Sequence, residues 1–465
     1  MTLVRPPRAT TVRTPRRAPA DLPFAFADRG LAQALAAERD EAGWLRDERL
    51  TAFAAFESLA VETNQLYTPY IDLRAADLFA AKPFVRTAAA SAASPDSSPV
   101  PTGTSGLIEL DEDGVGSIGL SEVARARGVV LETFGSALTR DAAAFRAELE
   151  GGSLLPANDK LAMLTRAFWS QGVRLVVPDG VSLDEPIILR WVAGAPDRAL
   201  LTRTFVRLGR GAKVGLVEEL APSRESGAAG GQSLFAGTLE IDLGADAELR
   251  VASIQDFGPQ QVVLQHRQAA IGAGANLHWA LAQLGGRLVR SRVDNRLEGD
   301  RSSVEQVEIV FGSDEQLFDL TSYTRHVGRD TTGNLLSKGV LIDAARTYMK
   351  GMITIDKTAI GTDSFLGEFG MNLSKKTRSV AIPSLEIDQP DCRRAAHSSS
   401  VGPIDESQLF YLESRGIPPD EARKFIVLGF LEPVVARVPL EAERERLRGL
   451  LEAKWDAGRD AAAAA

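Results

Sequence analysis

The sequence contains 465 residues, of which 44% are hydrophobic and 25% charged, with a formal net charge of −9. This is the composition of a globular protein with room for about three domains, and its acidity disfavours a general nucleic-acid-coating role, because phosphate binding needs a basic surface. No apolar run is long enough for a transmembrane helix, and the single cysteine, Cys392, excludes an internal disulfide and a four-thiolate metal site. We therefore expect a cytoplasmic protein that binds neither nucleic acid nor membrane.

The N-terminal part divides into a tail, a helical region and a linker. Residues 1–28 contain five arginines before the first acid and lack the apolar core of a secretory signal, which predicts a disordered basic tail. An organelle transit peptide is the alternative, disfavoured by three prolines among the first 18 residues. Residues 87–105 are a low-complexity linker. Residues 29–86 are predicted to be helical, because apolar side chains recur at helical spacing, namely Trp44, Leu45, Phe53, Phe56 and Leu59.

The hydrophobic period changes near residue 172. Residues 106–171 form a mixed, mainly helical lead-in, with a helix over 158–170 capped by Asn158 or Asp159. Residues 172–403 consist of short β-rich runs separated by Gly, Asp or Pro. Helical crossovers of the length that a doubly wound α/β fold requires do not separate these runs, so a mainly β fold is predicted.

One turn element recurs within the β-rich region. LGRGAKV, LGADAEL and IGAGANL each contain an apolar residue, Gly, a two-residue step and Ala, and LEGDRSSV is a looser copy. A spacing of a few tens of residues between such turns favours a β-solenoid, in which each coil buries its inner face against its neighbours. The alternative is a β-sandwich with repeated glycine turns. The copies occupy 208–214, 243–249, 271–277 and 297–304.

Helical patterning returns over 404–465. Asp405 is predicted to cap one helix, which Gly416 and Pro418 end, and Asp420 to cap the next. A charged amphipathic helix follows at 440–455. The architecture is therefore helical, then β-solenoid, then helical.

Motifs of several enzyme classes are missing from the sequence. It has no GxxxxGK[ST] phosphate loop, no HExxH and no GxSxG. The acid groups Glu218/Glu219 and Asp111/Glu112/Asp113 are interpreted as solvated turns or strand edges. The chain is therefore predicted not to be an enzyme.

Motifs in a fixed order give the sequence a family resemblance. NDKLAMLTRAFW, LSKGVLIDAARTYMKG, TDSF, PSLEI, AAHSSSVGPIDESQLFYLESRGI and EARKFIVLGFL resemble the SufB/SufD family of the SUF iron–sulfur assembly system, over roughly residues 150–455. The resemblance implies a right-handed parallel β-helix between helical ends. It also implies pairing with a second β-helix subunit and docking of a SufC ATPase on the C-terminal helices. The predicted partner-binding residues on these helices are Leu409, Phe410, Phe425 and Phe430.

The resemblance favours the SufD branch over the SufB branch. The essential thiol of SufB aligns with Thr377, and a hydroxyl cannot replace a thiolate as sulfur acceptor or iron ligand. The His-Glu pair of SufB aligns with His397 and Ser398, so the histidine is kept and the acid is absent. Many SufD sequences have a cysteine two residues before this histidine, where Ala395 stands here, and no role is transferred to Cys392.

His397 is the candidate cluster-assembly or metal residue, because a neutral imidazole suits iron and can shuttle protons. The sequence places it in a turn of small residues, where the alternative is a purely structural hydrogen bond. His326 is interpreted as a packed structural residue. Lys338, Gly339 and Gly351 are assigned to turns, with Lys338 and Arg346 as weaker anion-binding candidates.

The hypothesis that the sequence favours is a SufD-like scaffold in a SufB–SufC–SufD complex. The chain alone would hold no stable cofactor, and an iron–sulfur cluster would form transiently at a site shared with a SufB-like subunit. Two alternatives remain: a SufB-like scaffold that holds the cluster itself, and a β-helix enzyme acting on polysaccharide, disfavoured by 6% aromatic content.

Overall fold

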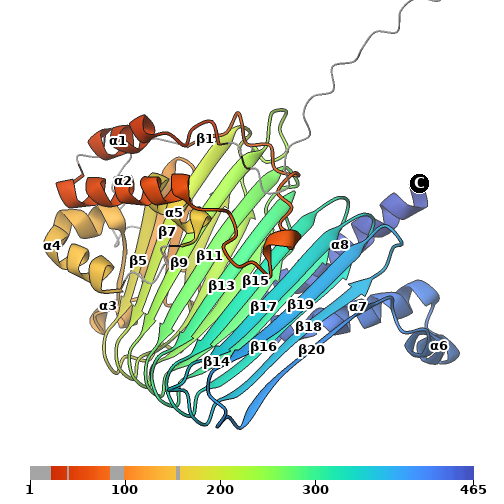
Figure 1. The fold of residues 1–465 in the computed structure, drawn as a ribbon. Helices are drawn as coiled ribbons and strands as arrows, with labels where there is room; N and C mark the ends of the chain where they lie inside the picture. Colours follow the sequence, from red (N-terminus) through yellow and green to blue (C-terminus); the bar gives the residue numbers. More distant parts are fainter. Residues whose placement is uncertain (1–21, 23, 39–40, 84–98, 153–157, 465) are drawn as a thin grey trace, which may run out of the picture.

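Two ten-stranded sheets dominate the computed structural model, which describes residues 22, 24–38, 41–83, 99–152 and 158–464 (Figure 1). The first sheet has the spatial order β19 (Arg378–Ile387), β17 (Arg346–Ile355), β15 (Leu317–His326), β13 (Leu288–Leu297), β11 (Gln261–Ile271), β9 (Ser233–Leu243), β7 (Arg198–Leu208), β5 (Gln171–Val177) and β4 (Val130–Thr133), with β1 (Lys82–Pro83) beside β7. The second sheet has the order β20 (Arg394–Gly402), β18 (Asp363–Asn372), β16 (Thr332–Leu341), β14 (Ser303–Gly312), β12 (Asn276–Gln283), β10 (Glu248–Gln255), β8 (Lys213–Pro222), β6 (Ile187–Ala193), β2 (Gly106–Asp111) and β3 (Gly114–Leu120).

The chain alternates between the two sheets from β5 to β20, and consecutive coils pair in parallel. Only the β2–β3 and β4–β5 pairs are antiparallel among the strands described. This arrangement confirms the predicted parallel β-helix. A sandwich built from hairpins would require antiparallel neighbours throughout.

The recurring turns lead from the first sheet to the second, and their glycines stack on one another. A Cβ on Gly272 would lie 2.6 Å from the carbonyl oxygen of Leu243, and one on Gly299 would collide with the backbone of Ala273. The glycine in each turn is therefore needed because the preceding coil's backbone lies where a side chain would begin. This close approach explains why the turn element recurs.

We expect Gly299→Ala to lower the free energy of unfolding by about 2 kcal/mol or more, because overpacking against backbone forces the coils apart. Gly402→Ala is the matched control, since a Cβ there meets no atom within 4 Å. Urea unfolding of both variants checks the prediction. Equal losses in the two variants would contradict the stacking explanation.

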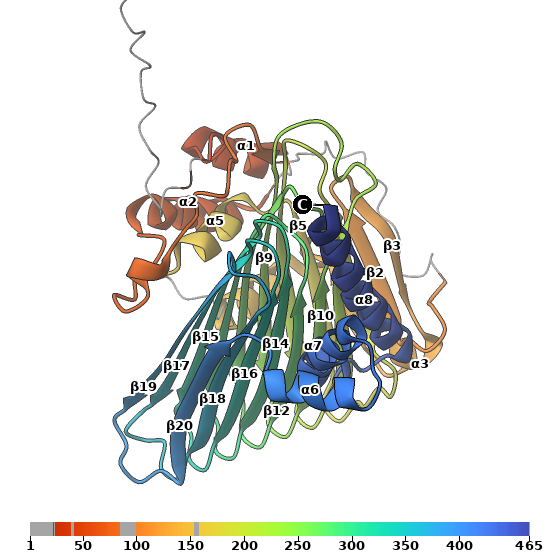
Figure 2. The ribbon, with the colours of Figure 1, turned by 90° about the vertical axis from the view of Figure 1, so that its right-hand side faces the viewer.

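Helices cover the outer faces of both sheets (Figure 2). On the first sheet, α1 (Arg29–Glu38), α2 (Gly43–Ser58), η1 (Thr68–Tyr70) and α5 (Lys160–Phe168) form one apolar cluster with the strands, and α4 (Phe134–Gly152) packs near β5. On the second sheet lie α6 (Glu406–Ser414), α7 (Pro419–Val435) and α8 (Glu441–Ala464). The short α3 (Glu122–Ala126) follows β3.

Several local predictions need correction at the N-terminal side. Residues 1–21 of the predicted tail, 1–28, lie outside the described residues. Phe26, near the end of that range, is buried, and the centre of its ring lies 5.7 Å from that of Phe168. The segment around Phe26 is therefore part of the fold rather than of a tail. Residues 87–98 of the predicted linker, 87–105, also lie outside the described residues. Ser105, at the end of that range, is buried and donates its backbone N–H to the carbonyl of Pro186. Part of the lead-in, 106–120, forms β2 and β3 and extends the second sheet.

The turns assigned around residue 340 are also wrong. Lys338 and Gly339 lie inside β16 and Gly351 inside β17, while the turn between these strands comes at 342–345. Gly351 is small because Leu366 packs against it across the interior. Asp420 is not a cap: Pro418 is the N-cap residue of α7, and Asp420 lies in the first turn. The predicted caps Asp159 and Asp405 do accept N–H groups at their helix starts.

Candidate functional site

The last coil, formed by β19 and β20, is an exposed end of the solenoid (Figure 1). Neither strand contains a buried residue, whereas every earlier strand of the solenoid does. Each of these strands also has one unpaired edge among the described residues. Such edges, ten and nine residues long, present free N–H and C=O groups to a partner strand.

His397 lies within β20 on the inner face of this coil. Its register partner in β18 is Leu366, which is buried in the interior, and parallel partners share a face. His397 is nevertheless exposed, because no further coil covers it among the described residues. The predicted turn at this position is therefore wrong: the small residues around His397 form an edge strand.

Thr377 and Cys392, which also bear on the choice of branch, lie outside β20. Thr377 is in the loop between β18 and β19, where its hydroxyl donates to the carbonyl of Ser374. Cys392 is half-buried against an apolar cluster that includes Leu366.

Glu368 is a residue that sequence reasoning missed. It lies on the inner face of β18, is only 1% exposed, and accepts the backbone N–H of Ile382 at 2.7 Å. Burial raises the pKa of its carboxyl to about 8, and the Ile382 N–H opposes that rise only in part. Whether an acidic side chain points into the solenoid depends on the register between strands, so the neighbouring residues in the sequence do not reveal it.

Three of the five acids interpreted as solvated are buried, whereas Asp113 is exposed and Asp111 is half-buried at the turn between β2 and β3, as predicted. Glu218 is buried in the interior, where it accepts hydrogen bonds from Ser253 at 2.6 Å and Arg267 at 2.8 Å. Glu219 is buried on the outer face and pairs with Arg190 at 2.8 Å. Glu112 is buried and accepts the N–H of Gly194. Only charged partners or backbone donors make such burial stable.

The predicted partner-binding residues divide into two groups. Phe410 and Phe425 are 72% and 60% exposed on α6 and α7. Leu409 and Phe430 are instead partly buried and pack against the apolar cluster between the C-terminal helices and the second sheet. A groove of about 530 Å³ separates these helices from the ends of β18 and β20, and its lining includes Phe369, Met371, Gly402, Phe425, Ile426 and Phe430.

Lys338 has a structural role in this region. Its ammonium group donates to the carbonyl of Phe430 at 3.0 Å and lies 4.5 Å from the centre of that ring. Arg346 lies 3.7 Å from Asp72. The Lys338 ammonium is therefore engaged in a structural contact, whereas anion binding by the half-exposed Arg346 stays a prediction.

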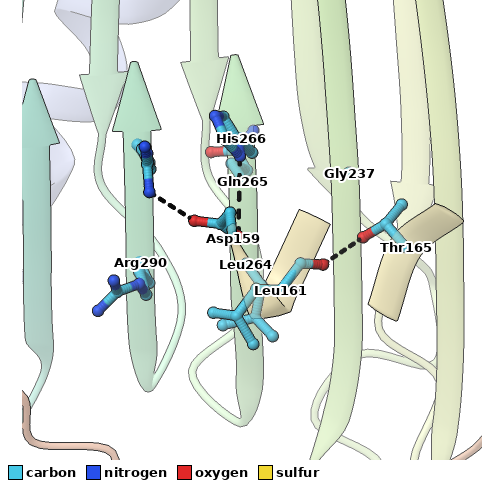
Figure 3. Close-up of a pocket in the computed structure, with 9 residues that line it drawn as sticks. Asp159, Leu161, Thr165, Gly237, Leu264, Gln265, His266 and Arg290 are labelled. Atoms are coloured by element: carbon cyan, nitrogen blue, oxygen red, sulfur yellow. Dashed lines mark hydrogen bonds and ion pairs between the residues drawn. The ribbon is translucent and has the colours of Figure 1, made fainter. Parts of the chain in front are cut away.

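A buried cluster of charges joins the N-terminal region to the outer face of the first sheet (Figure 3). Asp159 caps α5 and binds Arg292 at 2.8 Å, while His266 lies 2.6 Å from Asp294. Burial acts to lower the pKa of His266, but the hydrogen bonds and negative charges of Asp159 and Asp294 have the larger effect. The pKa of His266 is therefore raised above its usual value. The cavity in Figure 3 has a volume of about 10 Å³, so this cluster is a structural contact rather than a ligand site.

His326 is the packed structural residue that the sequence predicted. It is fully buried, with its two ring nitrogens 2.8 Å from the Thr331 hydroxyl and 3.0 Å from the Ser364 hydroxyl. Burial lowers its pKa to about 4, so the imidazole is neutral at pH 7.

Comparison with known proteins identifies the fold's family. Residues 191–430, more than half of the chain, match the family described as "SUF system FeS cluster assembly, SufBD core domain". The chain belongs to the SufBD family. The SufBD core begins within β6 and ends within α7, so it contains both the open end and the α6–α7 groove.

Curated relatives of this SufBD chain carry the same assignment. It is 28% identical over 317 residues to an iron–sulfur cluster assembly SufBD family protein of Staphylococcus epidermidis, covering 68% of this chain and 66% of the relative. It is 29% identical over 296 residues to the iron–sulfur cluster assembly protein SufD of Bacillus subtilis, covering 63% and 67%. The matched part therefore spans about two thirds of each relative.

Two further properties of the described residues bear on this SufBD chain. None of their helices combines the length and apolar character needed to cross a membrane. They also contain no group of three or more His, Cys, Asp or Glu side chains that could hold a metal ion.

Proposed function

We propose that this chain is a SufD-like, non-catalytic scaffold subunit of a cytoplasmic complex with a SufB-like subunit and a SufC-like ATPase. The observation that carries the proposal is the solenoid's open end: it presents His397 there, while Thr377 and Ser398 stand where SufB-like sequences have a thiol and an acid. The name of the Bacillus subtilis relative supports the same branch. The single cysteine suits a reducing compartment.

The open end suits a second β-helix as partner. Unpaired strand edges favour association with another strand, in which main-chain hydrogen bonds provide affinity. The chain has only one cysteine, so a cluster at this end would depend on thiolates of the partner and would form transiently as the product of the complex.

The α6–α7 pair suits the ATPase as partner. Phe410, Tyr411 and Phe425 are exposed within a short distance in sequence, on helices whose other apolar residues already pack against the solenoid. Clustered exposed aromatic side chains of this kind mark protein–protein contacts, and aromatic anchors contribute most of the binding energy in such contacts.

We expect the double variant Phe410→Ser/Phe425→Ser to lose the SufC-like ATPase while retaining the SufB-like subunit when all three chains are co-expressed. Replacing two aromatic anchors costs at least about 2 kcal/mol of binding, which reduces ATPase recovery more than tenfold. Phe79→Ser is the control, because Phe79 is 69% exposed on the N-terminal segment. Stoichiometric recovery of the ATPase with the double variant would contradict the docking proposal.

A further inference from the structure

Residues 61–83, here called the strap, run from the end of α2 across the outer face of the first sheet and back (Figure 1). On the outward path, Glu62 pairs with an arginine of β13 at 2.9 Å, Asn64 donates to a tyrosine hydroxyl of β15 at 3.3 Å, and Tyr67 donates to a carbonyl of β17 at 2.8 Å. The strap then returns to β7, with which β1 pairs. Its outermost part therefore lies over β17, one strand before the unpaired edge of β19.

The tip of the strap, residues 63–70, also contacts the last coil. The hydroxyl of Tyr67 interacts with the Ser384 side chain of β19. Tyr70 and Val380 of β19 both pack against the apolar cluster that joins the N-terminal helices to the first sheet. Neighbouring strands are about 5 Å apart, so the outer face of a partner strand paired with β19 would lie beside this tip.

The turn that carries Leu66 is held by hydrogen bonds. The side-chain oxygen of Asn64 accepts the N–H of Leu66 at 3.0 Å. The carbonyl of Asn64 accepts the N–H of Tyr67 and the hydroxyl of Thr68, each at 3.0 Å. Leu66 itself is 55% exposed. A fixed turn presents this leucine in one backbone conformation, so little ordering remains to be done when a partner covers it.

Large exposed apolar side chains lie on both sides of the unpaired edge. Ile387 of β19 and Val401 of β20 are exposed on the last coil. Ile387 belongs to the inner face, because its register partner Ile355 is buried in the interior. Leu66 is exposed on the outer side of the same sheet. Exposed apolar groups that gather beside an unpaired strand are typical of a protein–protein contact.

We propose that the strap tip contacts the outer face of the partner strand that pairs with β19, with Leu66 as its apolar contact. The partner is the SufB-like subunit, so this inference rests on the proposed function and deepens it. The subunit would then be held by main-chain pairing at the edge and by the tip from outside. The partner surface facing Leu66 should carry small or apolar side chains, because an unpaired charge buried there would be costly.

The test is titration of the purified full-length chain with the SufB-like subunit. We expect Leu66→Asp to raise the Kd about tenfold or more, because it removes a buried leucine and places a carboxylate against an apolar surface. Phe79→Asp is the matched control: Phe79 is exposed on the returning part of the strap, shortly before β1 and β7, and β7 is six strands from β19. The control should change the Kd less than about twofold. Both variants should keep the wild-type melting temperature, since both side chains are exposed.

A third variant, Val401→Asp, separates this inference from the proposed pairing. It places a charge on the last coil itself and should weaken pairing whether or not the strap takes part. Equal affinity of wild type and Leu66→Asp, with weaker binding of Val401→Asp, overturns the strap contact and leaves the pairing in place. A wild-type chain that does not bind the SufB-like subunit overturns both.

Amide hydrogen exchange of the wild-type chain tests the contact without any substitution. On binding the SufB-like subunit, the N–H groups of residues 63–70 should exchange about tenfold more slowly, whereas those of residues 77–80 should be unchanged. Unchanged exchange at the tip in the bound chain overturns the inference, even if Leu66→Asp binds weakly through a folding defect.

Discussion

Replacing Arg290 with methionine should lower the free energy of unfolding by about 3–5 kcal/mol. Arg290 is buried on β13, where its guanidinium group binds Asp319 and Glu62, each at 2.9 Å. Asp319 also binds Lys350, which is fully buried. Methionine keeps an unbranched side chain but lacks the guanidinium group, so it leaves the Glu62 carboxylate buried without its countercharge. Equilibrium unfolding in urea measures the loss.

Arg296→Met is the control for this substitution. Arg296 lies on the same strand and outer face, but it is exposed and pairs with Glu298 at 2.8 Å. Exposed ion pairs contribute about 0–1 kcal/mol, so the control should unfold close to wild type. A comparable loss in both variants would show that the buried contact does not hold the segment carrying Glu62 to the solenoid.

His397→Ala should remove most of the iron and sulfide from the complete three-subunit complex without unfolding this subunit. The side chain is exposed on the last coil, and removing an exposed side chain changes stability by about 0.5 kcal/mol or less. Loss of an imidazole that binds iron or transfers a proton would instead impair cluster formation on a partner's thiolates. Iron and sulfide are measured chemically, beside the melting temperature.

His278→Ala is the corresponding control, because His278 lies on the outer face of β12, 3.5 Å from Glu305 and far along the solenoid from β20. Full cluster content in His397→Ala would exclude an assembly role for this histidine. A large fall in melting temperature, with a proportionate loss of iron, would mean that His397 supports the last coil instead.

The sequence predicts those features that depend on neighbouring residues. The stacked turns are visible because each needs its own glycine, and Asp159 and Asp405 are identifiable as caps because the N–H groups they accept lie two or three residues away. The period change near residue 172 marks the start of β5 within a residue.

The side chains inside the solenoid could not be predicted, because their direction depends on register between coils about 30 residues apart. Glu218 and Glu219 are adjacent in sequence, yet one lies inside with Arg267 and the other outside with Arg190. His397 sits among small residues typical of a turn, but pairing with β18 makes that segment a strand. Glu368 was missed for the same reason.

The two ends of the solenoid differ, and we expect this difference to limit the number of further subunits that can add to it by strand pairing. At the first end, β3 and β4 run antiparallel to their neighbours and are only seven and four residues long, and α4 packs beside β4. A short strand running the wrong way is a poor template for another parallel coil. At the other end, β19 and β20 can accept one. We therefore expect growth through the open end to stop after a single partner has joined, so that the exposed strands give a closed pair rather than a fibre.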